Sequence, residues 1–475
     1  MVDLSNLSFG EYTAEIEDDL QDYFLESPEV IDKIEKGGKY LVLGRKGSGK
    51  TAIFKFLEKD FPKKWGRKVI SLDLDGYPFE EHKKLGESGV IPALVFVKSW
   101  KLMICVSVLA EMYPELTKDQ QKMFRNSITK LGSLGDAYLS KVGKWLKSLT
   151  MVELPSILDV GGGSVQWDSE DIDSYSIAAS IAEMENLLAD VYQHHPFTVL
   201  IDRIDDSWNA DDYSKRFVYG AIRAARDINA KMNSVRSSSG EPSAIIVFLR
   251  TDIWDSIKFN DKNKLTSKRI ELKWTDVQLR DVIQLRIRNS LGLSKGEVWP
   301  EAFEEGIVAQ KRTSDSYIIS RTMMKPRDAV AFCIYAAEAR TDDAEKIKPE
   351  DVKRGEIEFS QHMLRELEDE MEPFVNTFVD SFDDVVRILR YIGVRSFSHD
   401  DWCDACTHFD VGVPDAESLL ERLMESSAIG HLKQGGGEGG SRTEYTYSNR
   451  YLTPDPSRKF QFHHSLVDSL GLKQK

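Results

Sequence analysis

Cysteine is scarce in this chain of 475 residues, where only four occur: Cys105, Cys333, Cys403 and Cys406. So few thiols in so long a chain exclude a disulfide framework. Cys403 and Cys406 form a single CxxC with His399 and His408 nearby, which leaves metal or redox chemistry open. A structural zinc site usually needs a second ligand pair, however, and two cysteines three residues apart also fit one buried helix face. We therefore expect core packing at this pair.

Positive charge is also in short supply. The chain has 63 Lys and Arg residues against 78 Asp and Glu, which gives a formal net charge of −15. Such a chain repels nucleic acid and anionic membranes unless its basic residues cluster locally. Nucleic acid is therefore not the favoured partner on charge alone.

Long apolar runs are missing as well. The first twenty residues are acidic where a secretory leader would be basic and then apolar. The best candidate for a membrane span, Ile91 to Met112, is interrupted by Lys98 and Lys101. We expect a buried helix there, a cytoplasmic protein and no membrane partner.

The order of apolar patterns predicts several domains, as does the length. Short apolar runs at 39–43, 69–74, 197–201 and 244–249 alternate with helical segments, which predicts an α/β fold with a parallel sheet. A helical stretch of about 80–192 interrupts it as an insertion. The pattern then turns helical, and a hairpin at 429–434 and 442–447 follows two late helices, as in a winged helix. The predicted domains are an acidic lead-in (1–35), an α/β core (36–270), a helical lid (271–375) and a winged helix (376–475).

One motif carries the strongest chemical signal. The segment GRKGSGKT satisfies GxxxxGK[ST], follows an apolar strand and begins a helix. Glycines let backbone N–H groups turn toward phosphates, Lys50 reaches the β- and γ-phosphates, and Thr51 ligates Mg²⁺. This pattern predicts a P-loop that binds ATP or ADP, formed by Gly44, Arg45, Lys46, Gly47, Ser48, Gly49, Lys50 and Thr51.

A second strand supplies the carboxylate that a P-loop site needs. The run from Phe197 to Ile201 delivers Asp202 to the carboxyl edge of the sheet, where nucleotide binds. Asp202 is the Walker B candidate for the Mg²⁺ shell, together with Thr51. Asp205 or Asp206 could orient or polarise the attacking water. The alternative for these two later acids is a solvated cap on the next helix.

Two arginines are candidates for contacts with the γ-phosphate. Arg250 ends the strand at 244–249, and its alternative role is an ion pair at the strand end. Arg327 follows Pro326 at the start of a helix, where a cation opposes the helix dipole by roughly 0.3–1 kcal/mol. An anionic partner would explain it, and we favour phosphate over Asp328 or another carboxylate.

Together these residues resemble the signal-transducing STAND and KAP-like branches of the AAA+ P-loop ATPases, and most closely a bacterial P-loop ATPase family. The matching features are the acidic lead-in with Tyr23-Phe24, GRKGSGKT, LIDRIDD, FLRTDIW, Leu272-Lys273-Trp274-Thr275 and the Pro326-Arg327-Asp328 helix start. They span most of residues 10–470, although the helical insertion matches weakly. One departure is that Arg203 and Asp206 stand where a STAND Walker B commonly has a small residue and a Glu, which puts rapid hydrolysis in doubt.

The resemblance implies an α/β core, a helical lid and a winged helix that closes on ADP, in switches of bacterial stress or phage defence. The leading hypothesis is thus a Mg²⁺-dependent ATPase, a switch or motor subunit that hydrolyses ATP slowly and signals to a protein effector or sensor. Assembly into a homo-oligomer is a further possible partner arrangement. The alternatives are a DNA-binding ATPase resembling replication initiators and a scaffold that binds nucleotide without hydrolysis. The candidate recognition helix, Asp415 to Ser426, has four acids and one arginine, which disfavours DNA.

Overall fold

This computed structural model describes residues 3–14, 16–17, 20, 28–80, 82, 92–130, 174–236, 240–260, 262–294, 296–343, 345–433 and 442–474. Internal contacts divide the chain into two units. The first, here the core unit, comprises Glu26–Lys46 and Lys50–Leu272. The second, the C-terminal unit, comprises Met1–Leu25, Gly47–Gly49 and Lys273–Lys475.

Five parallel strands form the sheet of the core unit. In spatial order they are β2 (Lys68–Asp73), β3 (Phe197–Asp202), β4 (Ile245–Arg250), β1 (Leu41–Gly44) and β5 (Arg269–Glu271). Strands β1, β3 and β4 are buried at almost every position, as in a parallel sheet covered on both faces. The α/β fold class with a parallel P-loop core is therefore confirmed, and the carboxyl ends of β1, β3 and β4 meet at one edge.

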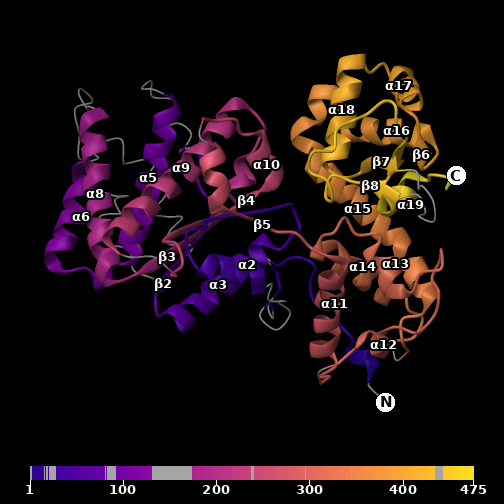
Figure 1. Cartoon of the computed structure of the whole chain (residues 1–475), viewed down its shortest axis with the longest axis horizontal. Helices are drawn as coiled ribbons and strands as arrows, with labels where there is room; N and C mark the ends of the chain where they lie inside the picture. The colour runs from indigo at the N-terminus through magenta and orange to yellow at the C-terminus, as the bar shows by residue number, and fades with distance from the viewer. Residues whose placement is uncertain are drawn as a thin grey trace, which may run out of the picture. The chain divides into compact units, whose positions relative to one another are not determined.

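Helices cover both faces of this sheet. Helix α3 (Lys50–Trp65) packs against β1 to β4, whereas α9 (Asp212–Val235) and α10 (Thr251–Ser256) contact β4. Figure 1 draws α2 (Pro28–Glu35) and α3 below the sheet and α9 and α10 above it. Helix α9 begins where the Asp211 carboxylate accepts the Ser214 N–H at 2.6 Å. Because both faces are covered, ligands can reach the strands only at their ends.

The described residues between β2 and β3 are mainly helical. Helix α5 (Pro92–Glu111) packs against α8 (Ser174–His194) and α9, and α6 (Lys118–Lys130) packs against α8. Within α5, Trp100 is fully buried and its Nε1 donates to Phe217 O at 3.1 Å. The apolar character of this stretch thus serves the core, as expected. Three consecutive glycines, 161–163, interrupt this stretch in the sequence and lie outside the described residues.

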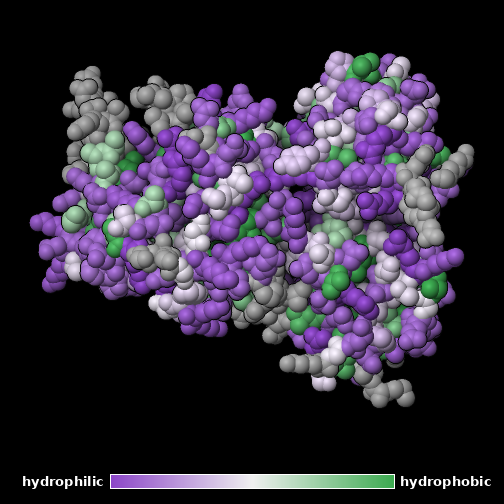
Figure 2. Space-filling view, viewed as in Figure 1, coloured by the Kyte–Doolittle hydropathy of each residue, from purple (hydrophilic) through white to green (hydrophobic). Residues whose placement is uncertain are grey.

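The surface is mainly polar where it can be seen. Among the described helices, none is long and apolar enough to cross a lipid bilayer. Figure 2 shows purple residues over most of the visible face and only small, separate green areas. Large exposed apolar side chains, such as Tyr12, Met123 and Tyr451, come from distant parts of the sequence.

The C-terminal unit begins with helices. Helix α11 (Asp276–Ser290) has a full capping box of Thr275 and Gln278. The short helices α12 (Trp299–Ala302) and α13 (Ser314–Ile319) lead to α14 (Pro326–Glu338) and to α15, a helix of 30 residues (Pro349–Phe378). The N-terminal segment packs on α11, where Arg286 bonds to Phe9 O and, at 2.9 Å, to Glu17. The sequence boundary predicted at 375/376 falls inside α15.

The remaining elements form a winged helix. In order they are α16 (Phe382–Ile392), β6 (Ser396–Phe397), α17 (His399–His408), α18 (Val413–Glu425), β7 (Ile429–Lys433), β8 (Arg442–Glu444), β9 (Phe460–Phe462) and α19 (Val467–Leu470). The predicted hairpin is present, with Lys433 opposite Arg442. Strand β9 lies between β6 and β7, an arrangement the sequence did not predict. The glycine tract at 434–441 lies outside the described residues.

Candidate functional site at the P-loop

The P-loop has the backbone geometry that its glycines permit. Gly47 and Gly49 have φ angles of +78° and +94°, in the left-handed region where a side chain would be strained. The loop turns at these residues, and α3 then begins at Lys50, which places a helix N-terminus beside the loop. The buried Ser48 hydroxyl has no hydrogen-bond partner among the described residues, while Trp274 Nε1 donates to Ser48 O at 2.9 Å.

Lys50 points back into its own loop. Its Nζ donates to the carbonyl oxygens of Gly44 and Arg45, at 3.2 Å each. Burial lowers the pKa of Lys50, while the nearby carboxylates Asp205 and Asp202 act in the opposite direction. Two backbone carbonyls are weak partners for a desolvated ammonium, so an anion beside the loop would stabilise its charge further.

Thr51 and Asp202 meet although 151 residues separate them. The Thr51 hydroxyl donates to Asp202 Oδ2 at 2.9 Å, and the Arg203 N–H donates to Oδ1 at 2.9 Å. Asp202 is only 2% exposed, and burial raises its pKa to about 6, with Lys50 opposing and Asp205 reinforcing the rise. A hydroxyl and a carboxylate are oxygen ligands of the kind that Mg²⁺ prefers, and a cation here would offset the cost of burying the carboxylate.

Arg203 holds the turn after Asp202 in an unusual conformation. Its φ angle is +62°, in the left-handed region that non-glycine residues seldom occupy. Its side chain forms ion pairs with Asp75 at 2.9 Å and with Asp73 at 3.5 Å. Because the same residue directs a backbone N–H onto Asp202, these ion pairs help to fix the orientation of that carboxylate.

Asp205 and Asp206 occupy different surroundings within one 3₁₀ turn (Ile204–Ser207). The Asp205 side chain is 16% exposed, lies 3.9 Å from Arg250 Nε and acts on the Lys50 charge. Asp206 is more exposed, and partial burial together with Asp205 raises its pKa to about 6. Neither caps the next helix, because Asp211 does so. The structure thus separates two acids that the sequence left equivalent.

Arg250 ends β4 directly beside the first residue of the P-loop. The register pairs it with Gly44, so β4 is the neighbour of β1, as its suggested role requires. Its guanidinium bonds to both carboxylate oxygens of Asp252, at 3.1 and 2.7 Å. The ion pair at the strand end, which was its alternative role, is therefore present. Contact with a γ-phosphate stays a prediction.

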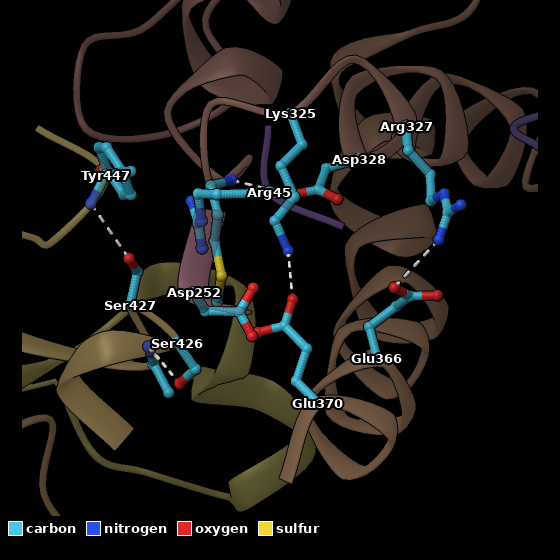
Figure 3. A network of polar contacts seen from close by, with 12 residues as sticks. Arg45, Asp252, Lys325, Arg327, Asp328, Glu366, Glu370, Ser426, Ser427 and Tyr447 are labelled. Atoms are coloured by element: carbon cyan, nitrogen blue, oxygen red, sulfur yellow. Dashed lines mark hydrogen bonds and ion pairs between the residues drawn. The ribbon is translucent and has the colours of Figure 1, made fainter. Parts of the chain in front are cut away.

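Arg327 lies near the middle of the P-loop and pairs with a carboxylate. Its N–H donates to Gly47 O at 3.5 Å, and a Cβ added to Gly47 would lie 3.3 Å from Arg327 Cβ. Its Nη1 lies 3.4 Å from Glu366 Oε2 on α15, and Figure 3 shows this pair beside that of Lys325 and Glu370 at 2.8 Å. Asp328 instead accepts the Met323 N–H. The sequence missed Glu366, because no local pattern marks a partner 39 residues away.

A nucleotide with Mg²⁺ fits this donor set. The loop supplies left-handed glycines, a helix start and a buried hydroxyl without a partner, and Lys50 adds a cation. Thr51 and Asp202 supply the oxygen ligands for the metal.

Comparisons with known proteins give a partial family match. Residues 277–368 match the model of a family described as FunZ-associated C-terminal helical domain. The chain is also 22% identical over 342 residues to the Escherichia coli (strain K12) protein named "Putative transposon gamma-delta 80.3 kDa protein". That alignment covers 68% of this chain and 45% of the other protein, so the chain spans less than half the length of this curated relative.

Two solved structures align with this chain over most of its length. Cdc6p from Pyrobaculum aerophilum aligns with a TM-score of 0.33 and 12% identity, over 99% of this chain and 96% of its own. A Walker-type ATPase of Pyrococcus abyssi aligns with a TM-score of 0.38 and 12% identity, over 94% and 98%. These scores are low, and the fold assignment depends on the strand order and the loop geometry described above.

Proposed function

We propose that this chain is a Mg²⁺-dependent ATPase that acts as a nucleotide-controlled switch or motor subunit. One observation supports this most directly: Thr51 and Asp202, from the two halves of a P-loop site, bond at 2.9 Å beside the half-buried Lys50. Such a site needs no covalent chemistry from the protein, because phosphoryl transfer depends on positioning and charge.

Each residue has a role in this proposal. Lys50 binds the β- and γ-phosphates, and the N–H groups of the loop and of the α3 start surround them. Thr51 and Asp202 hold Mg²⁺, which would neutralise charge on the phosphate oxygens. Asp205, which faces Lys50 and Arg250, orients the attacking water. Asp206 stands where comparable sites often have a Glu, and aspartate is shorter, so we expect slow turnover.

ATP binding and turnover test the proposal. Calorimetry and a phosphate-release assay are run on the wild type, on Lys50→Ala and on Lys59→Ala, which changes an exposed lysine of α3 as a matched control. We expect Lys50→Ala to lose ATP affinity with its circular dichroism unchanged, and Lys59→Ala to behave as the wild type. Equal affinity in all three proteins would refute the site. ATP binding without any release of phosphate would favour the non-hydrolysing scaffold.

The proposed output is a signal to a protein effector or sensor, in a bacterial stress or antiphage system. The switch draws support from the backbone contact of Arg327, whose N–H donates to Gly47 O at 3.5 Å at the start of α14. Nucleotide on the loop would therefore act on this helix start. Affinity capture on a tagged chain with Asp205→Asn, which should keep ATP bound without releasing phosphate, tests for a nucleotide-dependent partner when it is run with and without ATP.

A DNA-binding ATPase is the second candidate because a winged helix is present. The charges of α18 argue against it: Asp415, Glu417, Glu421 and Glu425 outnumber Arg422, which itself pairs with Glu425. Basic residues near the wing are also partly neutralised, since Lys433 lies 2.8 Å and Arg458 3.7 Å from Glu444.

Short duplexes test this second candidate by fluorescence anisotropy. We expect weak binding that falls steeply with salt, because only nonspecific phosphate contacts remain. Tight, sequence-selective binding at physiological salt would instead favour the DNA-binding ATPase over the protein-signalling switch. The name of the curated relative refers to a transposon, which makes duplexes with transposon ends a suitable probe.

A further inference from the structure

Three potential metal ligands lie together in the winged helix, far in sequence from the P-loop. His399 and Cys403 are four residues apart on α17, so they share one face of the helix, and Glu417 reaches them from α18. One ligand atom from each lies within 4.8 Å of the other two. Helices α17 and α18 pack against each other and appear as neighbours in Figure 1.

The sulfur–nitrogen distance within this cluster suits a metal ion, while the carboxylate hydrogen-bonds the other ring nitrogen. Cys403 Sγ lies 3.6 Å from His399 Nδ1, and His399 Nε2 lies 2.7 Å from Glu417 Oε1. In a tetrahedral zinc site, bonds of about 2.3 Å to sulfur and about 2.05 Å to nitrogen place these two atoms about 3.6 Å apart. The sulfur and nitrogen thus already have the separation that one ion between them would require.

The surroundings also favour a cation. The carboxylates of Asp400 and Asp404 add negative potential at Cys403, and Glu417 adds more. The site is accessible, because the side chains of His399 and Glu417 are 18% and 40% exposed and Cys403 is only partly buried. Cys406, by contrast, is 1% exposed and belongs to the hydrophobic core. The second cysteine of the CxxC therefore packs in the core, as expected, while the first faces a histidine.

We propose that His399, Cys403 and Glu417 bind one divalent transition-metal ion of the zinc class. The thiolate, the imidazole Nδ1 and the carboxylate are the three protein ligands, and water completes the tetrahedron. The thiol proton leaves to solvent when the metal–sulfur bond forms, and the Glu417 carboxylate exchanges its hydrogen bond to Nε2 for the metal. A sulfur and nitrogen donor set disfavours Mg²⁺, so this site is separate from the proposed nucleotide site.

Cobalt spectroscopy tests the proposal on the full-length protein. After dialysis against a chelator, CoCl₂ alone is added and the near-ultraviolet thiolate-to-cobalt band is recorded, which oxygen ligands at the P-loop cannot produce. We expect one equivalent of the band in the wild type, none in Cys403→Ser, and at least tenfold weaker Zn²⁺ affinity by competition in His399→Gln and Glu417→Gln. The matched controls, Cys406→Ala and the exposed His408→Ala, should keep the band.

Several results would overturn the assignment. Absence of the band in the wild type, or its persistence in Cys403→Ser, would leave a hydrogen-bonded cluster without metal. Loss of the band in a folded Cys406→Ala protein would transfer the ion to the CxxC pair. Because Glu417 is well exposed, Glu417→Gln should fold normally, and unchanged Zn²⁺ affinity in that variant would refute the three-residue ligand set. Circular dichroism confirms the fold of each variant.

Discussion

Lowering the pH should weaken Mg²⁺-dependent ATP binding through Asp202. This carboxyl group is buried and its pKa is raised to about 6, yet it must be ionised to hold the metal. With that pKa, the ionised fraction falls from about 0.97 at pH 7.5 to about 0.24 at pH 5.5, which predicts about fourfold weaker metal-dependent binding. A carboxyl with the ordinary value of 3.8 would stay about 98% ionised at pH 5.5 and would show no loss.

The assay compares ATP affinity with Mg²⁺ and with EDTA at each pH. Nucleotide concentrations are expressed as the fully ionised species, so that titration of the phosphates does not contribute. Asp206→Asn is the key control, because the pKa of Asp206 is also raised to about 6. We expect this variant to keep the pH dependence and Asp202→Asn to lose the Mg²⁺ effect at every pH. A metal effect that is constant from pH 7.5 to 5.5 in the wild type would refute the reasoning, as would loss of the dependence in Asp206→Asn alone.

Three further predictions concern single residues of the site. A raised pKa means that ionised Asp202 lowers the free energy of unfolding, a cost that is absent below the unfolded pKa of 3.8 and complete above the folded pKa of about 6. Asp202→Asn should therefore stabilise the nucleotide-free protein by up to about 3 kcal/mol at pH 7.5 and by about half that at pH 5. Equal denaturation midpoints for the wild type and the variant would contradict this. Asp205→Asn should abolish most phosphate release while keeping ATP affinity, whereas Asp206→Asn should not, and the reverse order in single-turnover assays would exchange their roles. Arg327→Ala should lower the ratio of ATP to ADP affinity, whereas Glu366→Gln, which frees the Arg327 guanidinium, should raise this ratio by up to about fivefold. If calorimetry shows that each variant changes the ATP and ADP affinities equally, Arg327 and Glu366 form only a structural ion pair.

Local sequence signals predicted the framework of the site well. The strand before Gly44, the glycine turn and the helix from Lys50 are all encoded within about 25 consecutive residues, where apolar runs and glycines suffice. The strand ending in Asp202 was equally clear because all six of its positions are buried. Two short strands, β5 and β9, were not predicted, because each has three residues, too few for a periodicity to appear. Strand β8 is equally short but was predicted from the glycine tract that joins it to β7.

Features that depend on distant contacts could not be predicted. The difference between Asp205 and Asp206 arises from what each faces, Lys50 and Arg250 for one and Arg203 for the other. The left-handed turn at Arg203 has no sequence signature either, since it is a non-glycine residue held by hydrogen bonding and ion pairs. The pairing of Arg327 with Glu366 likewise required tertiary structure.

Helix α15 carries the partner of Arg327 and the winged helix on one element. Its 30 residues span about 45 Å. Arg327 meets it at Glu366, and the winged helix packs on the same stretch, through Ser469 at Ser360 and through Arg422 over the ring of Phe374. A change in the contacts of Arg327 could thus reach the winged helix through about four turns of a single helix, with Pro373 inside that stretch as the place where the helix can bend.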